Sequence, residues 1–162
     1  MAKYTTRFSP IVAVYVLCGL PRRGIFYVGS SVNPSSRLWQ HVTNAASHED
    51  GKKTALIHQI ESDGGTIRLI ILEWVDESIR ELAENWWIGE LIMRGYHLVN
   101  SARDEKRGMR IRNENRHTPS ITLASLTDLQ FIDAPKGNRN ADAKQKIRDF
   151  LTSEAQRYLE SL

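Results

Sequence analysis

Residues 13–41 constrain the fold of this chain more than any other part of its sequence. Two runs rich in β-branched and aromatic residues, Ile11 to Cys18 and Ile25 to Gly29, flank the turn residues 19–24, GLPRRG. Apolar runs on both sides of a short turn containing Gly and Pro are typical of an antiparallel hairpin. The sequence therefore predicts that the chain begins its fold with two paired strands.

Each of these two runs carries one tyrosine. If the turn is centred on Pro21, Tyr15 and Tyr27 lie opposite each other on one face of the hairpin. A slip of the pairing by one residue would separate them, because successive side chains of a strand point to opposite faces. We therefore expect a pair of tyrosines on one face, provided that this register holds.

A helix start follows the hairpin directly. Asn33 is a favoured N-cap residue, and Pro34 suits the first helical position, where no hydrogen bond from its nitrogen is needed. Side chains four residues apart lie on the same face of a helix. Arg37 and His41 should consequently project together beside the end of the hairpin.

The next sixty residues predict the remainder of a small α+β fold. The expected elements are a helix over 52–62, a strand over 66–75, a helix from Asp76 to Gly95 and an extended segment over 96–100. Together with the hairpin they give a small antiparallel sheet, three strands in its core, flanked by helices. This unit would occupy residues 1–101.

One carboxylate of the helix predicted from Asp76 to Gly95 lies in an unusual position. Glu84 shares a stripe with Trp87 and Ile88, and burying an unpaired carboxylate beside such residues is costly. Glu90 has Arg94 four residues later, which we interpret more simply as a surface pair. Glu84 is thus the candidate for a functional acid.

The chain after residue 101 has a different character. Residues 1–100 contain ten basic and ten acidic side chains, whereas 103–116 contain six Arg or Lys and three Asp or Glu. This segment is either a contact to backbone phosphates or a solvated linker. The extension 102–162 ends in an amphipathic helix over 140–162. That helix could pack on the sheet or form a homodimer contact.

The sequence also indicates where the protein works. It contains a single cysteine, Cys18, so no internal disulfide can form, which fits a reducing compartment. Cys18 lies in an apolar strand and is interpreted as buried and inert. The run Ile11 to Leu20 is too short to span a membrane. We expect a first strand rather than a signal peptide, and a soluble, cytoplasmic protein that does not bind membranes.

The polar groups named so far suit phosphodiester chemistry. An arginine can hold a scissile phosphate in a fork and offset charge in the transition state. One carboxylate can hold one Mg²⁺, which otherwise keeps waters and binds phosphate oxygens. A tyrosine or a histidine can move the proton of an attacking water.

In this order and spacing the residues resemble the GIY-YIG nuclease family over about residues 11–101. The first motif is represented by Ala13-Val14-Tyr15 and the second by Tyr27-Val28-Gly29, with eleven residues between the tyrosines. The remaining matches are Arg37 eight residues after Gly29, His41 four residues later, Glu84 before Trp87-Ile88, and then Gly95, Leu98 and Asn100. The departures, Ala13 for Gly and Val14 and Val28 for Ile, affect packing rather than chemistry.

The resemblance implies a function and a set of roles. The activity would be metal-dependent hydrolysis of DNA phosphodiester bonds, with one Mg²⁺ or Mn²⁺ ion in each active site. The implied roles are Tyr15 as general base or water-positioner, Tyr27 as its support, Arg37 on the phosphate, His41 in proton transfer, Glu84 on the metal and Asn100 as a brace. The DNA sequence or structure that is cut stays open, as does the oligomeric state.

Two other classes of function fit the same sequence. The chain could be a nucleic-acid-binding module that keeps the fold without cutting, or an α+β interaction protein whose polar cluster is coincidental. A module that had lost activity would be expected to lack at least one site residue, and all five polar positions are present. The endonuclease is therefore the leading hypothesis.

Overall fold

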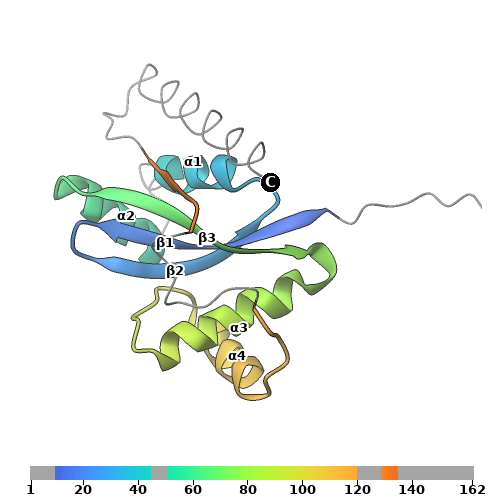
Figure 1. Cartoon of the computed structure of the whole chain (residues 1–162). Helices are drawn as coiled ribbons and strands as arrows, with labels where there is room; N and C mark the ends of the chain where they lie inside the picture. The colour runs from blue at the N-terminus through green and yellow to red at the C-terminus, as the bar shows by residue number, and fades with distance from the viewer. Residues whose placement is uncertain (1–9, 45–50, 120–128, 135–162) are drawn as a thin grey trace, which may run out of the picture.

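The computed structural model describes residues 10–44, 51–119 and 129–134, which form an antiparallel sheet with helices on both faces (Figure 1). The strands are β1 (Ile11–Leu20), β2 (Gly24–Ser31), β3 (Thr66–Asp76) and β4 (Phe131–Asp133), and their order across the sheet is β2-β1-β3-β4. The α+β class and the antiparallel sheet predicted from the sequence are confirmed. The predicted number of strands is wrong, because the sheet has four.

Four helices complete the fold of the described residues, and the first three begin and end close to where the sequence predicts, whereas no helix was predicted for the fourth. They are α1 (Pro34–Asn44), α2 (Lys52–Ser62), α3 (Arg80–Met93) and α4 (Ala102–Asn113), with a 3₁₀ turn at Glu77–Ile79. Asn33 Oδ1 accepts a hydrogen bond of 3.1 Å from the Ser36 backbone N–H, as expected of an N-cap. The Asp76 carboxylate caps the 3₁₀ turn in the same way, at 2.9 Å from the Ser78 nitrogen.

Strand β1 is the centre of the molecule, with helices over both of its faces. Tyr15 and Leu17 face the core under α1 and α2, whereas Val14 and Val16 face the core under α3 and α4 (Figure 1). All four side chains are completely buried. This explains why β1 reads as a nearly continuous apolar run rather than as an alternating pattern.

The register of the hairpin differs from the predicted one by two residues. Tyr15 pairs with Gly29 and Leu17 pairs with Tyr27, so the two tyrosines are diagonal neighbours on one face and not directly opposite. The pairing is irregular next to Leu17, so that Phe26 is an extra residue in β2. The extra residue and a turn centred beyond Pro21 together account for the difference.

Strand β4 comes from the C-terminal extension and pairs with the free edge of β3. Arg68 of β3 makes a two-fold ion pair with Asp133, at 2.6 and 3.0 Å, and its guanidinium carbon lies 3.8 Å from the centre of the Phe131 ring. A strand of three residues is too short to show the periodicity from which it could be predicted. This arginine, which holds the strand in place, precedes Asp133 by 65 residues in the sequence.

Helix α4 packs directly on α3, so residues 103–116 are not a solvated linker. The two helices approach at Gly89 and Gly108, where each glycine lacks the Cβ atom that would collide with the backbone of the other helix. The Ser101 hydroxyl caps α4 by accepting a bond from the Asp104 nitrogen at 3.1 Å. Ile111 of α4 is buried against α3 and the sheet. The basic segment is therefore a packed helix.

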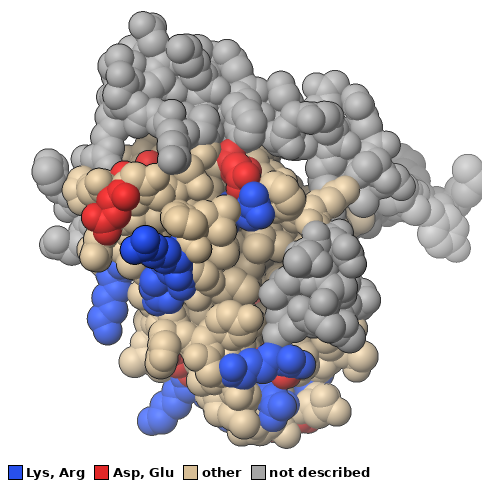
Figure 2. Space-filling view, turned by 60° about the vertical axis from the view of Figure 1, so that its left-hand side comes forward, with Lys and Arg blue, Asp and Glu red and all other residues tan. Residues whose placement is uncertain are grey.

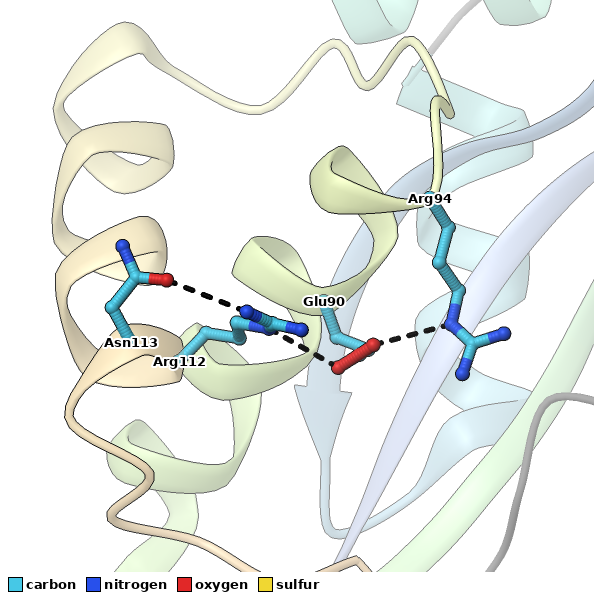
Figure 3. A network of polar contacts seen from close by, with 4 residues as sticks. All are labelled: Glu90, Arg94, Arg112 and Asn113. Atoms are coloured by element: carbon cyan, nitrogen blue, oxygen red, sulfur yellow. Dashed lines mark hydrogen bonds and ion pairs between the residues drawn. The ribbon is translucent and has the colours of Figure 1, made fainter.

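Glu90 is a buried link between these two helices and not the surface pair that the sequence suggests (Figure 3). Its side chain is only 12% exposed and lies between Arg94 Nε at 3.2 Å and Arg112 Nε at 3.4 Å. The predicted pairing with Arg94 is confirmed, but its position at the surface was wrong, because Arg112 comes from α4, which local spacing on α3 cannot reveal. A buried carboxylate needs such partners to offset its desolvation.

A second buried carboxylate ties the chain after α4 to the sheet. The Glu73 side chain on β3 accepts a hydrogen bond of 2.6 Å from Trp87 Nε1. His117 Nε2 lies 3.0 and 3.1 Å from the two carboxylate oxygens of Glu73. His117 therefore has a structural role. Trp87 lies in the core and has its indole N–H satisfied there.

The terminal helix expected over 140–162 lies outside the described residues and stays a prediction, as does a homodimer formed through it. In the ranges that the structure describes, every helix is too short or too polar to cross a membrane.

We predict that Gly89→Ala destabilises the fold by about 1–3 kcal/mol, because its methyl group would overlap the Gly108 carbonyl and force α3 and α4 apart. Urea denaturation followed by circular dichroism measures the change in the free energy of unfolding. Gly51→Ala is the matched control, since the nearest atom that a Cβ there meets among the described residues is Thr54 Oγ1, at 4.0 Å. Equal losses in both variants would contradict the close packing.

Candidate active site at the end of the hairpin

At the candidate site a tyrosine side chain lies against a glycine of the neighbouring strand. Tyr15 of β1 is opposite Gly29 of β2, and its ring crosses over that glycine. A Cβ atom on Gly29 would lie 2.6 Å from the Tyr15 hydroxyl oxygen, well inside van der Waals contact. The glycine of the Tyr27-Val28-Gly29 motif is therefore needed here for the passage of a tyrosine and not for a special backbone angle.

Beyond Gly29 the Tyr15 hydroxyl meets His41, in the last turn of α1. The hydroxyl oxygen lies 2.8 Å from His41 Nε2 in a buried hydrogen bond. Tyr27 approaches the same imidazole edge-on, with ring centres 5.5 Å apart. Two of the residues expected from the sequence, Tyr15 and Tyr27, thus both contact a third, His41, although the two tyrosines are not directly paired.

Burial holds this pair in its neutral form. Removal from water lowers the pKa of His41 to about 3, and the positive charges of Lys53 and Arg37 act in the same direction. Burial also raises the pKa of Tyr15 above its usual range, Tyr27 adds to that rise, and the Arg37 charge opposes it. At neutral pH the site therefore contains a phenol and an uncharged imidazole. When the imidazole carries its proton on Nδ1, its Nε2 can accept the phenol proton.

Arg37 supplies the positive charge on this side of the sheet. It lies one turn before His41 on α1, is half-buried, and donates a hydrogen bond of 2.9 Å to Gln40 Oε1. Its charge lowers the pKa of Tyr15 and of Tyr27, against the effect of burial on both. A guanidinium has five N–H donors, so the bond to Gln40 leaves others for an anion.

Glu84 reaches the site from the opposite helical layer. Its Oε2 accepts a hydrogen bond of 2.5 Å from the Ser30 hydroxyl, and Ser30 in turn receives bonds of 2.8 Å from Arg80 to its hydroxyl and to its carbonyl. Burial raises the pKa of Glu84, while Ser30 and Arg80 counter that rise. The negative charge of Glu84 raises the pKa of Tyr27 as well, so the two groups influence each other.

The Glu84 carboxylate suits the binding of one hard divalent cation whose other ligands would come mostly from substrate and water. Among the described residues, hydrogen bonding to Glu84 involves Oε2 only, which leaves Oε1 for a ligand. No group of three or more His, Cys, Asp or Glu side chains in the described part of the chain could form an all-protein cage. Mg²⁺ accepts a single carboxylate together with phosphate oxygens and waters.

Asn100 acts on the backbone rather than on the polar cluster. Its side-chain oxygen accepts a bond of 3.0 Å from the Val28 N–H, and its amide donates one of 2.9 Å to the Val28 carbonyl. The Val99 N–H also bonds the Phe26 carbonyl at 2.7 Å. The outer edge of β2 is thus held at the residue between Tyr27 and Gly29.

Sequence reasoning missed three residues at this site. Ser30 directly follows the second motif and Arg80 lies one helical turn before Glu84, so both could have been found from their spacing. Lys53 could not have been found in this way, because it lies on α2, away from the motifs in the sequence. Its ammonium lies 5.1 Å from the centre of the Tyr27 ring, and its charge helps to lower the pKa of His41.

Comparison with family models, with curated proteins and with solved structures finds no match for this chain. The argument for its function therefore depends on its own residues and on their geometry.

We predict that His41 makes the protein less stable as the pH falls. An unfolded histidine titrates near 6.5 and folded His41 near 3. Between these values the unfolded chain binds the extra proton. The contribution of His41 to the free energy of unfolding is therefore complete above about pH 6.5 and is lost as the pH falls toward 3. The free energy of unfolding falls by at most about 1.4 kcal/mol per pH unit in this range. Urea denaturation at pH 7, 6 and 5 measures it.

In the same series His41→Gln should show a smaller pH dependence than the wild type, because the titrating group is gone. His97→Gln is the control, since His97 is exposed. Equal slopes for the wild type and His41→Gln would mean that His41 is not desolvated as described.

Proposed function

We propose that this chain is a divalent-metal-dependent endonuclease of the GIY-YIG type, which hydrolyses DNA phosphodiester bonds. The observation that supports this most is the buried hydrogen bond between the Tyr15 hydroxyl and the neutral His41 imidazole, beside the charge of Arg37. A neutral proton-accepting pair next to a cation fits attack on an anionic ester. The ordered motifs of the sequence support the same conclusion.

In this mechanism Tyr15 and His41 move the proton of the attacking water. The water gives its proton to the Tyr15 oxygen as the phenol proton passes to His41 Nε2. The new oxygen–phosphorus bond forms while the bond to the leaving deoxyribose oxygen breaks. The low pKa of His41 keeps its imidazole unprotonated far into the acid range, so that it can accept a hydrogen bond from the phenol. A phosphate anion bound at Arg37 would raise this pKa and with it the basicity of the imidazole.

Arg37 would bind the phosphate. Its guanidinium can donate two parallel hydrogen bonds to non-bridging oxygens and offset the charge that grows on them in the transition state. Because Arg37 has no ion pair among the described residues, phosphate would not have to displace a carboxylate from it.

Glu84 would hold the metal through Oε1, with Ser30 and Arg80 fixing the orientation of the carboxylate. A Mg²⁺ or Mn²⁺ ion bound there supplies Lewis-acid stabilisation of a phosphate oxygen and of the leaving group. A bound cation would also favour the ionised carboxylate, against the burial that raises its pKa.

We predict that Glu84→Gln and Arg37→Ala each lower the rate of DNA cleavage by about 10²- to 10³-fold, because each removes charge stabilisation of the transition state. The assay is nicking of supercoiled plasmid with and without Mg²⁺. DNA binding measured in EDTA should survive Glu84→Gln, which separates loss of chemistry from loss of fold.

Glu81→Gln is the matched control for Glu84→Gln. It removes a carboxylate from the same helix, but the Glu81 side chain is 78% exposed and pairs with Arg107. Cleavage by Glu81→Gln should stay near the wild-type rate. Cleavage by Glu84→Gln at that rate would exclude Glu84 from the reaction, and a lack of cleavage by the wild type with DNA binding intact would favour the binding module.

A further inference from the structure

Three basic side chains form a stripe on the outward face of α4. Arg103, Lys106 and Arg110 are all exposed, and their spacing of three and four residues places them on one side of the helix. The described residues offer none of the three a hydrogen bond or an ion pair. We call these three residues the α4 stripe.

The other two basic residues of α4 that have described partners point elsewhere. Arg107 Nη1 bonds Glu81 Oε1 at 2.6 Å, and Arg112 Nε lies 3.4 Å from Glu90 Oε2, both on α3. These pairs attach α4 to α3, which orients the helix and directs the α4 stripe outward. Within the described part of the chain, the charges of the stripe are thus not used for internal packing.

The first turn of α4 lies beside the candidate active site. Ser101, its N-cap, directly follows Asn100, whose side chain holds Val28 in β2. The charge of Asp104, in that first turn, raises the pKa of Glu84 and of Tyr27. The α4 stripe therefore starts next to the catalytic groups and runs away from them along the helix.

The surface of the molecule agrees with this arrangement. In the space-filling view, Lys and Arg side chains lie at the lower end, in the region of α3 and α4, with Asp and Glu side chains among them, and further Lys and Arg side chains lie higher up on the left (Figures 1 and 2). Residues 1–100 contain equal numbers of basic and acidic side chains, whereas 103–116 contain six and three. The net positive charge of the protein is thus concentrated on the part of the chain to which α4 belongs.

We propose that the α4 stripe binds the phosphate backbone of duplex DNA on one side of the cleaved bond. With a rise of about 1.5 Å per residue, Arg103 and Arg110 lie about 10 Å apart along the helix axis. One DNA strand presents a phosphate about every 3.4 Å of its axis, so the stripe spans about three phosphates. Two parts of this proposal rest on the proposed function: that the partner is DNA, and that the contact lies on one side of the cleaved bond. The exposure of the three cations does not depend on that function.

The test is DNA binding by the triple variant Arg103→Gln, Lys106→Gln, Arg110→Gln, measured as full-length protein in EDTA with a 30-base-pair duplex at several salt concentrations. Loss of three phosphate contacts should lower the slope of log affinity against log salt by about 2.7, and affinity should fall at least about tenfold at low salt. The control compares two single variants, each of which removes one exposed cation: Arg22→Gln outside the α4 stripe and Lys106→Gln within it. Only Lys106→Gln should lower the salt slope. Arg22 is an exposed cation in the hairpin turn, at the other end of β2 from Ser30.

Shortening the DNA tests the direction of the contact. Where the wild type nicks a defined site, the duplex can be truncated on either side of it. Truncation on the side that the α4 stripe contacts should weaken wild-type binding and make it equal to that of the triple variant. Truncation on the other side should leave the difference between them intact. Equal effects from both truncations would overturn the proposed direction.

The outcomes separate this proposal from the proposed function. An unchanged salt slope in a folded triple variant overturns the α4 stripe as a DNA contact, even where cleavage depends on Glu84. A reduced slope in a protein that never cleaves supports the contact and rejects the endonuclease. Tighter, stripe-dependent binding of duplex RNA than of DNA would overturn the assignment of the partner. Circular dichroism and thermal unfolding confirm that the variant is folded.

Discussion

The position of the Tyr15 hydroxyl over Gly29 is the constraint on which the rest of the site depends. The phenol reaches His41 only because β2 has no side chain at that point, and His41 is there only because Asn33 fixes the start of α1. A slip of one residue in the β1–β2 pairing would turn Tyr15 into the opposite core. The contact between Tyr15 and His41 thus depends both on the register of β1 and β2 and on the residue at which α1 begins.

The site is assembled around an edge strand, which gives both helical layers access to it. Gly29 and Ser30 are neighbours in β2, and successive residues of a strand face opposite sides. Gly29 admits Tyr15 and His41 from the layer of α1, while Ser30 bonds Glu84 from the layer of α3. The outer edge of this strand is occupied at Val28 by Asn100, which limits movement of β2 at the point where the layers meet.

The sequence predicted the parts of the fold that depend on local chemistry. Asn33 and Asp76 cap helices as expected, because a cap is decided by residues within one turn. The missed parts depend on distant partners. β4 is held by Arg68, and Glu90 is buried by Arg112 from another helix. The hairpin register was wrong by two residues, because neither an extra residue in a strand nor the exact centre of a turn leaves a mark on the hydrophobic pattern.

The same difference between local features and distant partners explains why sequence reasoning missed Ser30 and Arg80 at the candidate site. Motif spacing identifies groups that could do chemistry, but not the groups that hold them. The described hydrogen bond to Glu84 comes from a hydroxyl, and Arg80 acts on the carboxylate through that hydroxyl rather than by a direct bond. A direct guanidinium pair would satisfy the carboxylate, whereas this indirect contact offsets its burial only in part. The carboxylate is oriented and still favours a cation, which is the electrostatic condition that binding of a metal to a single acid requires.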